Sequence, residues 1–191
     1  EAITITSQLT VAQFNTLAAQ TTGVVTATIS EEDMATLNGI TETGNALAIT
    51  VSDTTVSAAE LNTLNSKTTT DLTVNSLTIT GSAADVITAY TSTGAIDGLG
   101  NEAVTLTDTS INASVLITLD AFTTGLINAS SITALNGSAT DQATVRASSG
   151  ITGLPAKITP IAFTQIGSDI DGEATGDYSG ESVSLSADGS T

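Results

Sequence analysis

The chain has 191 residues, of which 40% are hydrophobic and only 3% aromatic, and its 3 basic residues stand against 20 acidic ones for a formal net charge of −17. This shortage of basic residues argues against binding to nucleic acid or anionic lipid, and it leaves cations as the expected charged partners. Cysteine and histidine are absent, which excludes disulfides, thiolate or imidazole metal ligands and Ser-His-Asp catalysis within this chain.

Two closely related stretches of sequence lie about 55 residues apart, a period typical of stacked repeats. Residues 48–70 read AITVSDTTVSAAELNTLNSKTTT, and residues 103–125 read AVTLTDTSINASVLITLDAFTTG. A more distant copy opens the chain at residues 3–23. Each repeat divides into two units in which a strand precedes a short helix, so we expect about six units in the chain.

Short segments that alternate apolar and hydroxyl residues predict one strand in each of five units. These segments are residues 3–6, 25–28, 49–52, 77–80 and 104–107. The alternation places residues such as Ile49, Leu77 and Val104 on a buried face. The Thr and Ser residues between them fall on the opposite face.

Helix starts are predicted where Ser, Thr or Asn precedes an apolar stripe, often with an acid or amide three residues later, as in a capping box. The predicted N-caps are Thr10, Ser30, Ser57, Ser82, Asn112 and Ser138. Pairs such as Leu61 and Leu64 give each helix a narrow buried face. Left-handed C-terminal residues are predicted at Gly23, Gly44, Gly94, Gly125 and Gly150.

Strands that alternate with helices in a fixed order predict an α/β fold with a parallel sheet. Because a unit has only about 20 to 32 residues, we expect a solenoid whose turns resemble the layout of leucine-rich repeats. The sixth unit departs from the pattern, with Gln142 at an apolar position and Pro155 and Pro160 near its end. We therefore assign residues 1–159 to the solenoid and residues 160–191 to an acidic, Gly- and Ser-rich segment.

Residues 163–191 read FTQIGSDIDGEATGDYSGESVSLSADGST and resemble the opening of an FG-GAP-like propeller repeat. That resemblance implies the start of another domain, while a linker or an assembly strand is the alternative. The candidate metal ligands are Asp169, Asp171, Glu173 and Asp177. Calcium is the cation expected there, because it binds carboxylate and carbonyl oxygens, and a solvated acidic turn is the alternative. The sequence predicts no required cofactor.

The phrases ELNTLN at residues 60–65 and GSAADV at residues 81–86 resemble the repeat regions of giant repetitive exoproteins of marine bacteria, cyanobacteria especially. The resemblance covers roughly residues 3–154 and implies a secreted or surface-displayed modular protein. It brings no catalytic residues with it.

The exposed hydroxyl residues of stacked strands should form two parallel columns. This candidate binding face consists of Thr26, Thr28, Thr50, Ser52, Thr78, Thr80, Thr105 and Thr107. Stacked strands lie about 4.8 Å apart, so the array would be regular, like those of ice-binding solenoids. The alternative is that Thr simply suits exposed strand positions.

The sequence contains no catalytic constellation. Asp53 and Asp108 share one position in two repeats, but they lie a full repeat apart, unlike the paired carboxylates of a glycosidase. We expect a structural role as a stalk, filament or surface-layer component of an extracellular protein, with a Thr-face binding module as the alternative. The partners expected are adjacent repeats of a longer chain, or copies that associate head-to-tail, with the C-terminal segment of residues 163–191 of one copy covering the open edge of residues 3–6 of the next.

Overall fold

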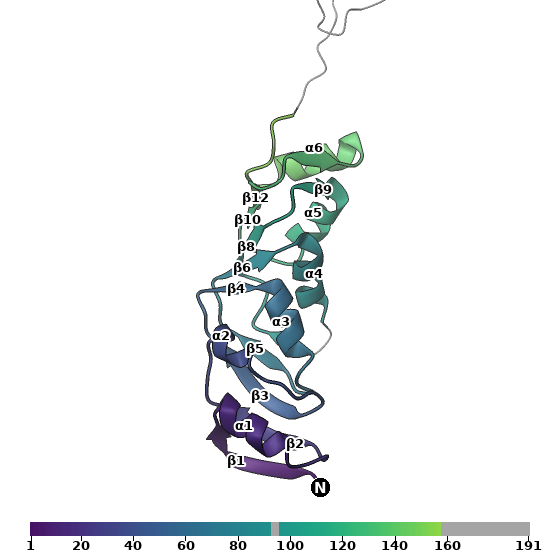
Figure 1. Cartoon of the computed structure of the whole chain (residues 1–191). Helices are drawn as coiled ribbons and strands as arrows, with labels where there is room; N and C mark the ends of the chain where they lie inside the picture. The colour runs from purple at the N-terminus through teal and green to yellow at the C-terminus, as the bar shows by residue number, and fades with distance from the viewer. Residues whose placement is uncertain (93–95, 158–191) are drawn as a thin grey trace, which may run out of the picture. The chain divides into compact units, whose positions relative to one another are not determined.

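A computed structural model describes residues 1–92 and 96–157, and the candidate calcium ligands lie outside these residues. The described residues form short helices and strands that alternate along the chain. Figure 1 shows these elements next to one another in chain order, from β1 to α6. The contacts divide the chain into Glu1–Ala156 and Lys157–Thr191. In the described part, no helix has the length and apolar character needed to cross a membrane.

Six helices are found among the described residues. They are α1 (Val11–Ala18), α2 (Met34–Leu37), α3 (Ala58–Asn65), α4 (Ala83–Thr91), α5 (Ala113–Asp120) and α6 (Ala139–Ala147). The strands are β1 (Ile3–Leu9), β2 (Val25–Ile29), β3 (Ala46–Val51), β4 (Thr55–Ser57), β5 (Leu72–Val74), β6 (Thr78–Gly81), β7 (Ile96–Asp97), β8 (Ala103–Leu106), β9 (Ser110–Asn112), β10 (Ile127–Asn128), β11 (Ala134–Asn136) and β12 (Ile151–Thr152).

All strand pairs are parallel, which confirms the predicted α/β fold with alternating strand-helix units. The strands form one sheet in the order β1-β2-β3-β5-β7, a second in the order β12-β10-β8-β6-β4, and a small sheet of β11 and β9. The prediction of one sheet is therefore wrong. Units from β3 onward carry a second short strand directly before the helix, and these strands pair with one another, β4 with β6 and β9 with β11.

The strand pairing shifts between α4 and α5. In most successive units like strands pair, so that Ile49 pairs with Leu72 in β3 and β5. However, β6, which directly precedes α4, pairs with β8, which is the first strand of its unit. The two-residue strand β7 extends the first sheet beside β5. This shift explains why the connection from α4 to α5 is longer than the connection from α3 to α4.

Five of the six predicted N-caps are confirmed. Thr10 forms a complete capping box with Gln13, and Ser57, Ser82, Asn112 and Ser138 each accept a hydrogen bond from a first-turn N–H. The prediction for Ser30 is wrong, because α2 begins later and is capped by Asp33. The Asp33 carboxylate accepts hydrogen bonds from both the backbone N–H and the hydroxyl of Thr36.

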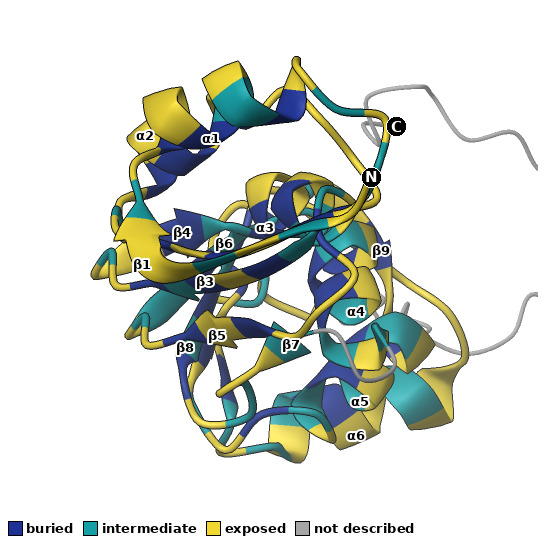
Figure 2. Ribbon diagram, turned by 90° about the horizontal axis from the view of Figure 1, so that it is seen from below, coloured by how far each residue is buried: buried dark blue, intermediate teal, exposed yellow. Residues whose placement is uncertain are grey.

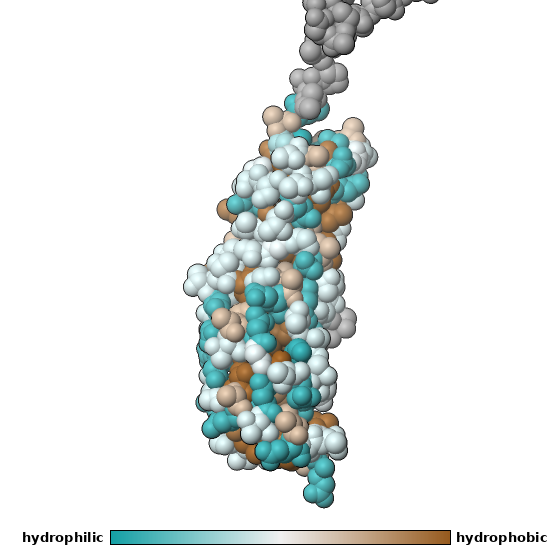
Figure 3. All heavy atoms as spheres, in the orientation of Figure 1, coloured by the Kyte–Doolittle hydropathy of each residue, from teal (hydrophilic) through white to brown (hydrophobic). Residues whose placement is uncertain are grey.

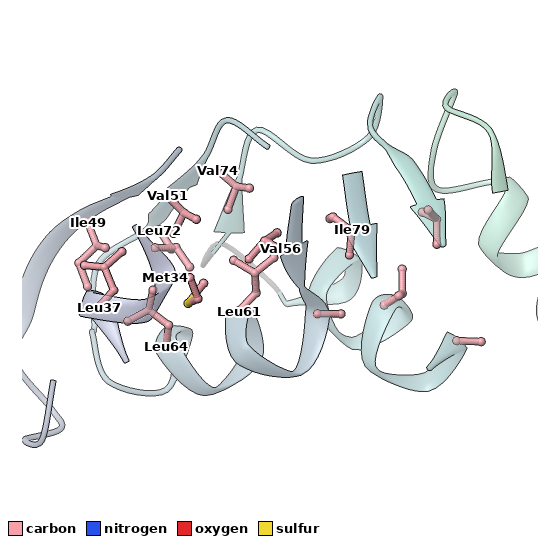
Figure 4. Close-up of a cluster of buried hydrophobic side chains, with 14 of the residues drawn as sticks. Met34, Leu37, Ile49, Val51, Val56, Leu61, Leu64, Leu72, Val74 and Ile79 are labelled. Atoms are coloured by element: carbon pink, nitrogen blue, oxygen red, sulfur yellow. The ribbon is translucent and has the colours of Figure 1, made fainter. Parts of the chain in front are cut away.

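The core lies between the inner faces of the strands and the apolar stripes of the helices, as the dark blue residues of Figure 2 show. Figure 4 shows one section of it, which consists of Met34, Leu37, Ile49, Val51, Val56, Leu61, Leu64, Leu72, Val74 and Ile79. Leu77 does not belong to this core and is 68% exposed. The predicted inward position of Leu77 is wrong because β6 begins only at Thr78.

The predicted left-handed conformation is present at Gly44, with φ of 76°, but not at Gly23, Gly125 or Gly150. Gly94 lies outside the described residues. A Cβ atom at Gly125 would lie 2.1 Å from the carbonyl oxygen of Glu102, directly before β8. Gly125 is therefore required by close approach of two backbones.

Candidate functional site

The predicted hydroxyl face is not brought together as two continuous columns. Thr26 and Thr28 pair with Ala46 and Ala48, and Thr50 pairs with Thr73 in the first sheet. Thr78, Thr80 and Thr105 lie in the second sheet, whereas Ser52 and Thr107 follow strand ends. A different file of outward polar residues is in register there, and it consists of Ser57, Thr80, Thr105, Asn128 and Thr152.

Three carboxylates bind the helix of the preceding unit. Asp53 Oδ2 accepts from the N–H of Met34 at 2.7 Å, and Asp108 Oδ2 accepts from the N–H of Ala83 at 2.7 Å. Glu31 accepts from the first N–H of α1 at 3.1 and 3.3 Å. These N–H groups have no partner within their own helices, and negative charge is favoured at a helix N-terminus. The shared position of Asp53 and Asp108 thus has a structural explanation.

At the starts of α3 and α5, a glycine of the following unit takes the place of the carboxylate. A Cβ atom at Gly81 would lie 3.3 Å from Cβ of Ala58, the first residue of α3. A Cβ atom at Gly137 would lie 2.7 Å from Oδ1 of Asn112, the cap of α5. Acid-bearing and glycine-bearing interfaces therefore form two classes of contact between units.

Hydroxyl groups that follow the helices bind carbonyls at the start of the same strand-helix unit. Thr21 Oγ1 donates to the carbonyl of Glu1, and Thr123 Oγ1 donates to the carbonyl of Glu102, both at 2.8 Å. The Thr68 hydroxyl occupies the same place and donates to Leu47 O at 2.8 Å. Thr68 and Thr123 are buried. These hydroxyls replace backbone pairing where the strands end.

Asparagine side chains link the helices of neighbouring units. Asn15 Nδ2 donates to Gly39 O at 2.7 Å, Asn38 Nδ2 donates to Glu60 Oε1 at 2.9 Å, and Asn62 Nδ2 donates to Asp85 O at 2.9 Å. This set was not predicted. The signal that could have revealed it is an Asn recurring in the first helices, on the side next to the buried stripe.

A buried carboxylate lies where the strand pairing shifts. Glu102 is 3% exposed and accepts hydrogen bonds from the backbone N–H of Gly100 and Asn101 at 2.9 and 3.1 Å. The Tyr90 hydroxyl also donates to Glu102. The Tyr90 ring stacks on that of Phe122 with centroids 5.7 Å apart. Burial, reinforced by the hydrogen bond to Glu102, raises the pKa of Tyr90 well above its ordinary value.

The sequence did not point to Glu102 as a buried group. The corresponding position in the repeat of residues 48–70 precedes that stretch and is occupied by Leu47, which is fully buried. The exchange of Leu for Glu requires the three donors supplied by Tyr90 and the loop at residues 100–101. With these hydrogen bonds the Glu102 carboxylate stabilises the place where β6 pairs with β8. It has no free oxygen directed at a substrate.

The surface hollows hold few carboxylates, and those of Glu32, Asp33 and Asp53 already have hydrogen-bond partners. A polar hollow of about 200 Å³ is lined by Thr21, Thr22, Glu42, Thr43 and Asn45 among others. In a second hollow, Ser52 Oγ donates to Glu32 at 2.6 Å, and the hydrogen bonds from Thr36 lower the pKa of Asp33. No group of three or more possible metal ligands occurs in residues 1–92 and 96–157.

On the face seen in Figure 3, hydrophobic residues are scattered among hydrophilic and near-neutral ones. The large hydrophobic side chains that are exposed in the described part are Val24, Leu77 and Leu126. Comparisons with models of protein families, with curated proteins and with solved structures found no match.

Proposed function

We propose that the chain is a solenoid segment of about six strand-helix turns, with a layout like that of leucine-rich repeats, and that it has a structural, non-catalytic role. The observation that carries this proposal is the use of the polar side chains. Glu31, Asp53 and Asp108 bind the helix of the preceding unit, and the amides of Asn38 and Asn62 donate to the helix of the following unit. Such nearest-neighbour contacts are what stabilises a repeat array.

The proposed setting is the outside of the cell, in a stalk, filament or surface layer. Support comes from the strong acidity, the absence of cysteine and the repeat phrases that resemble those of bacterial exoproteins. An antibody against the chain should label intact cells that produce it, and protease added outside those cells should remove the label. Labelling that appears only after permeabilisation contradicts this setting.

Stretching the full chain in single-molecule force spectroscopy tests the structural role. An array of nearest-neighbour units should unfold in steps, and each unit of roughly 24 residues should release about 80 Å of contour length. The variant Asp108→Ala should lower the force of the step next to α4, while Asp71→Ala serves as an exposed control. Release of the whole length in one event contradicts the solenoid.

The alternative function is that of a binding module for ice, glycan or protein. The observation that favours it is the in-register polar file of Ser57, Thr80, Thr105, Asn128 and Thr152 in the second sheet. Asn128→Lys and Thr152→Lys alter the exposed end of this file. If the chain is a binding module, these variants should lose the inhibition of ice recrystallisation or the binding to glycans that the native chain shows. If it is a structural segment, neither the native chain nor the variants should show either activity.

We also propose that the structural role includes head-to-tail association. Support comes from β1, whose outer edge has no neighbour among the described residues. The register of β1 against β2 shifts between Thr4 and Gln8, and such an irregularity limits pairing of an edge strand to its regular part. We propose as well that residues 169–177 bind calcium, and the support is the acidic composition.

A further inference from the structure

The unit that begins with β1 is built like the unit that begins with β8. Residues 1–6 read EAITIT and residues 102–107 read EAVTLT. The contacts match in type and length: Ile3 N to Val24 O and Val104 N to Leu126 O are both 2.9 Å, and Thr21 Oγ1 to Glu1 O and Thr123 Oγ1 to Glu102 O are both 2.8 Å. Therefore β1 is the structural counterpart of β8.

The two strands differ in their neighbours. β8 lies between β6 and β10, whereas β1 pairs with β2 alone among the described residues. In a parallel sheet, successive residues direct their N–H groups to opposite sides. The N–H of Ile3 points to β2, so the N–H of Thr4 points to the open edge. The neighbour that β1 does not have among the described residues corresponds to β6.

The counterpart of β6 is β11, which directly precedes α6. Figure 1 shows α6 and β1 at opposite ends of the described elements. β6 leads into α4 through Ser82, and β11 leads into α6 through Ser138. β6 pairs with β8 on its far side, but β11 pairs only with β9 in the described part. The chain after each helix is also alike, with a two-residue strand followed by a left-handed Gly98 or Gly153.

The β1 edge and the β11 edge carry opposite charges at corresponding positions. Where β6 pairs with β8, the Tyr90 hydroxyl donates a hydrogen bond to Glu102. The counterpart of Glu102 is Glu1, and the counterpart of Tyr90, eight residues after the helix cap, is Arg146. Arg146 Nη1 donates to Pro155 O at 2.6 Å, but its Nε is buried without a hydrogen-bond partner among the described residues.

We propose that the β11 edge and α6 of one copy bind the β1 edge of a second copy, and that Arg146 pairs with Glu1 of the second copy. By correspondence with Ile79–Val104 and Thr80–Thr105, Leu135 pairs with Ile3 and Asn136 with Thr4. These two pairs precede the register shift in β1. The two surfaces differ, so the contact propagates into a filament. The inference rests on the proposed structural role.

Sedimentation velocity over a concentration series of the full chain tests this contact. Glu1→Arg and Arg146→Glu should each weaken association by about tenfold, because each places like charges together. The double variant restores opposite charges and should recover association to within about threefold of the native chain. Association of the native chain should also weaken as salt is raised.

A second variant addresses the strand edge independently of charge. Thr4→Pro removes the N–H that points to the open edge and leaves the pairing of Ile3 with β2, since proline is tolerated on the free side of an edge strand. Far-UV circular dichroism checks that this variant is folded, and its association should be lost.

Three results would overturn the inference. They are a native chain that stays monomeric at every concentration, single charge reversals that leave association unchanged, and a double variant that associates no better than the single ones. A native chain that stays monomeric would also contradict the proposed head-to-tail association. None of the three results bears on the proposed solenoid, because a monomeric chain that unfolds in unit-sized steps still behaves as one. A chain that unfolds in one event fails the structural role whatever its association.

Discussion

The carboxylate of Asp108 accepts a hydrogen bond at 2.7 Å from the N–H of Ala83, which belongs to the preceding unit. Asp53 makes the same bond to Met34. Negative charge is thereby placed at the positive end of a neighbouring helix. This arrangement helps to explain how a chain with 20 acidic and 3 basic residues folds, since helix N-termini take part of the role that basic side chains usually have.

The first prediction concerns these carboxylates. Asp108→Ala and Asp53→Ala should each lower the free energy of unfolding by about 1–2 kcal/mol, the usual loss for a helix N-terminal acceptor. Asp71 is exposed and serves as the control. Asp71→Ala should change the free energy of unfolding by less than about 0.5 kcal/mol. Urea unfolding followed by circular dichroism measures these values. Equal losses at all three positions contradict the role of the carboxylates between units.

The second prediction concerns the core. Leu64 and Leu119 are 1% and 0% exposed, so truncation to Ala should cost about 2–5 kcal/mol through lost burial and the cavity left behind. Thr26 is exposed on its strand, and Thr26→Ser should cost far less. The same urea titration compares them. Small and similar losses at the Leu and Thr positions would show that the assignment of inner and outer faces is wrong.

Local patterns predicted much of the fold. Leu61 and Leu64 were assigned to the core from helical spacing, and Ser57, Ser82 and Ser138 were assigned as caps from their neighbours three residues on; the structure confirms both. Prediction failed at Ser30 because Asp33 is a competing cap only three residues later. Local rules cannot choose between two good caps when packing decides where the helix begins.

The contacts between units could not be predicted from periodicity. Asp53 was recognised as a shared position, but its partner, the N–H of Met34, depends on the register between units. The same holds for the second strands, such as β4 and β9, whose three residues are too few to show alternation. The pairing of these strands divides the predicted single sheet into two. Thr50 lies in the first sheet and Thr80 in the second, although the sequence predicts both on one binding face.

The third prediction concerns alkaline pH. The pKa of Tyr90 is raised in the folded chain by burial and by the bond to Glu102, so the folded state keeps its proton where the unfolded chain releases it. Stability should therefore fall as the pH rises from the ordinary tyrosine value of about 10 toward the raised folded value. Tyr90→Phe should remove this loss at high pH.

Absorbance of tyrosinate during an alkaline titration measures the Tyr90 effect directly. The difference between the native chain and Tyr90→Phe should show a phenol that ionises late, and thermal unfolding at several pH values should show the matching loss of stability. At neutral pH, Tyr90→Phe should cost about 1–3 kcal/mol because Glu102 stays buried with one donor fewer. Ionisation of Tyr90 near its ordinary pKa would contradict the buried contact.

The last prediction concerns cations. A net charge of −17 repels itself at low ionic strength, and any salt should reduce this repulsion by screening. Specific binding adds to screening, because a ligand that binds the folded state raises its stability with concentration. Millimolar calcium should therefore raise the Tm further than sodium chloride of equal ionic strength, if carboxylates of residues 169–177 hold the ion. The variant Asp169→Asn with Asp171→Asn should respond equally to the two salts. Equal responses in the native chain leave screening as the whole effect and exclude the calcium site, and an unchanged calcium response in the variant places the ion elsewhere in the chain.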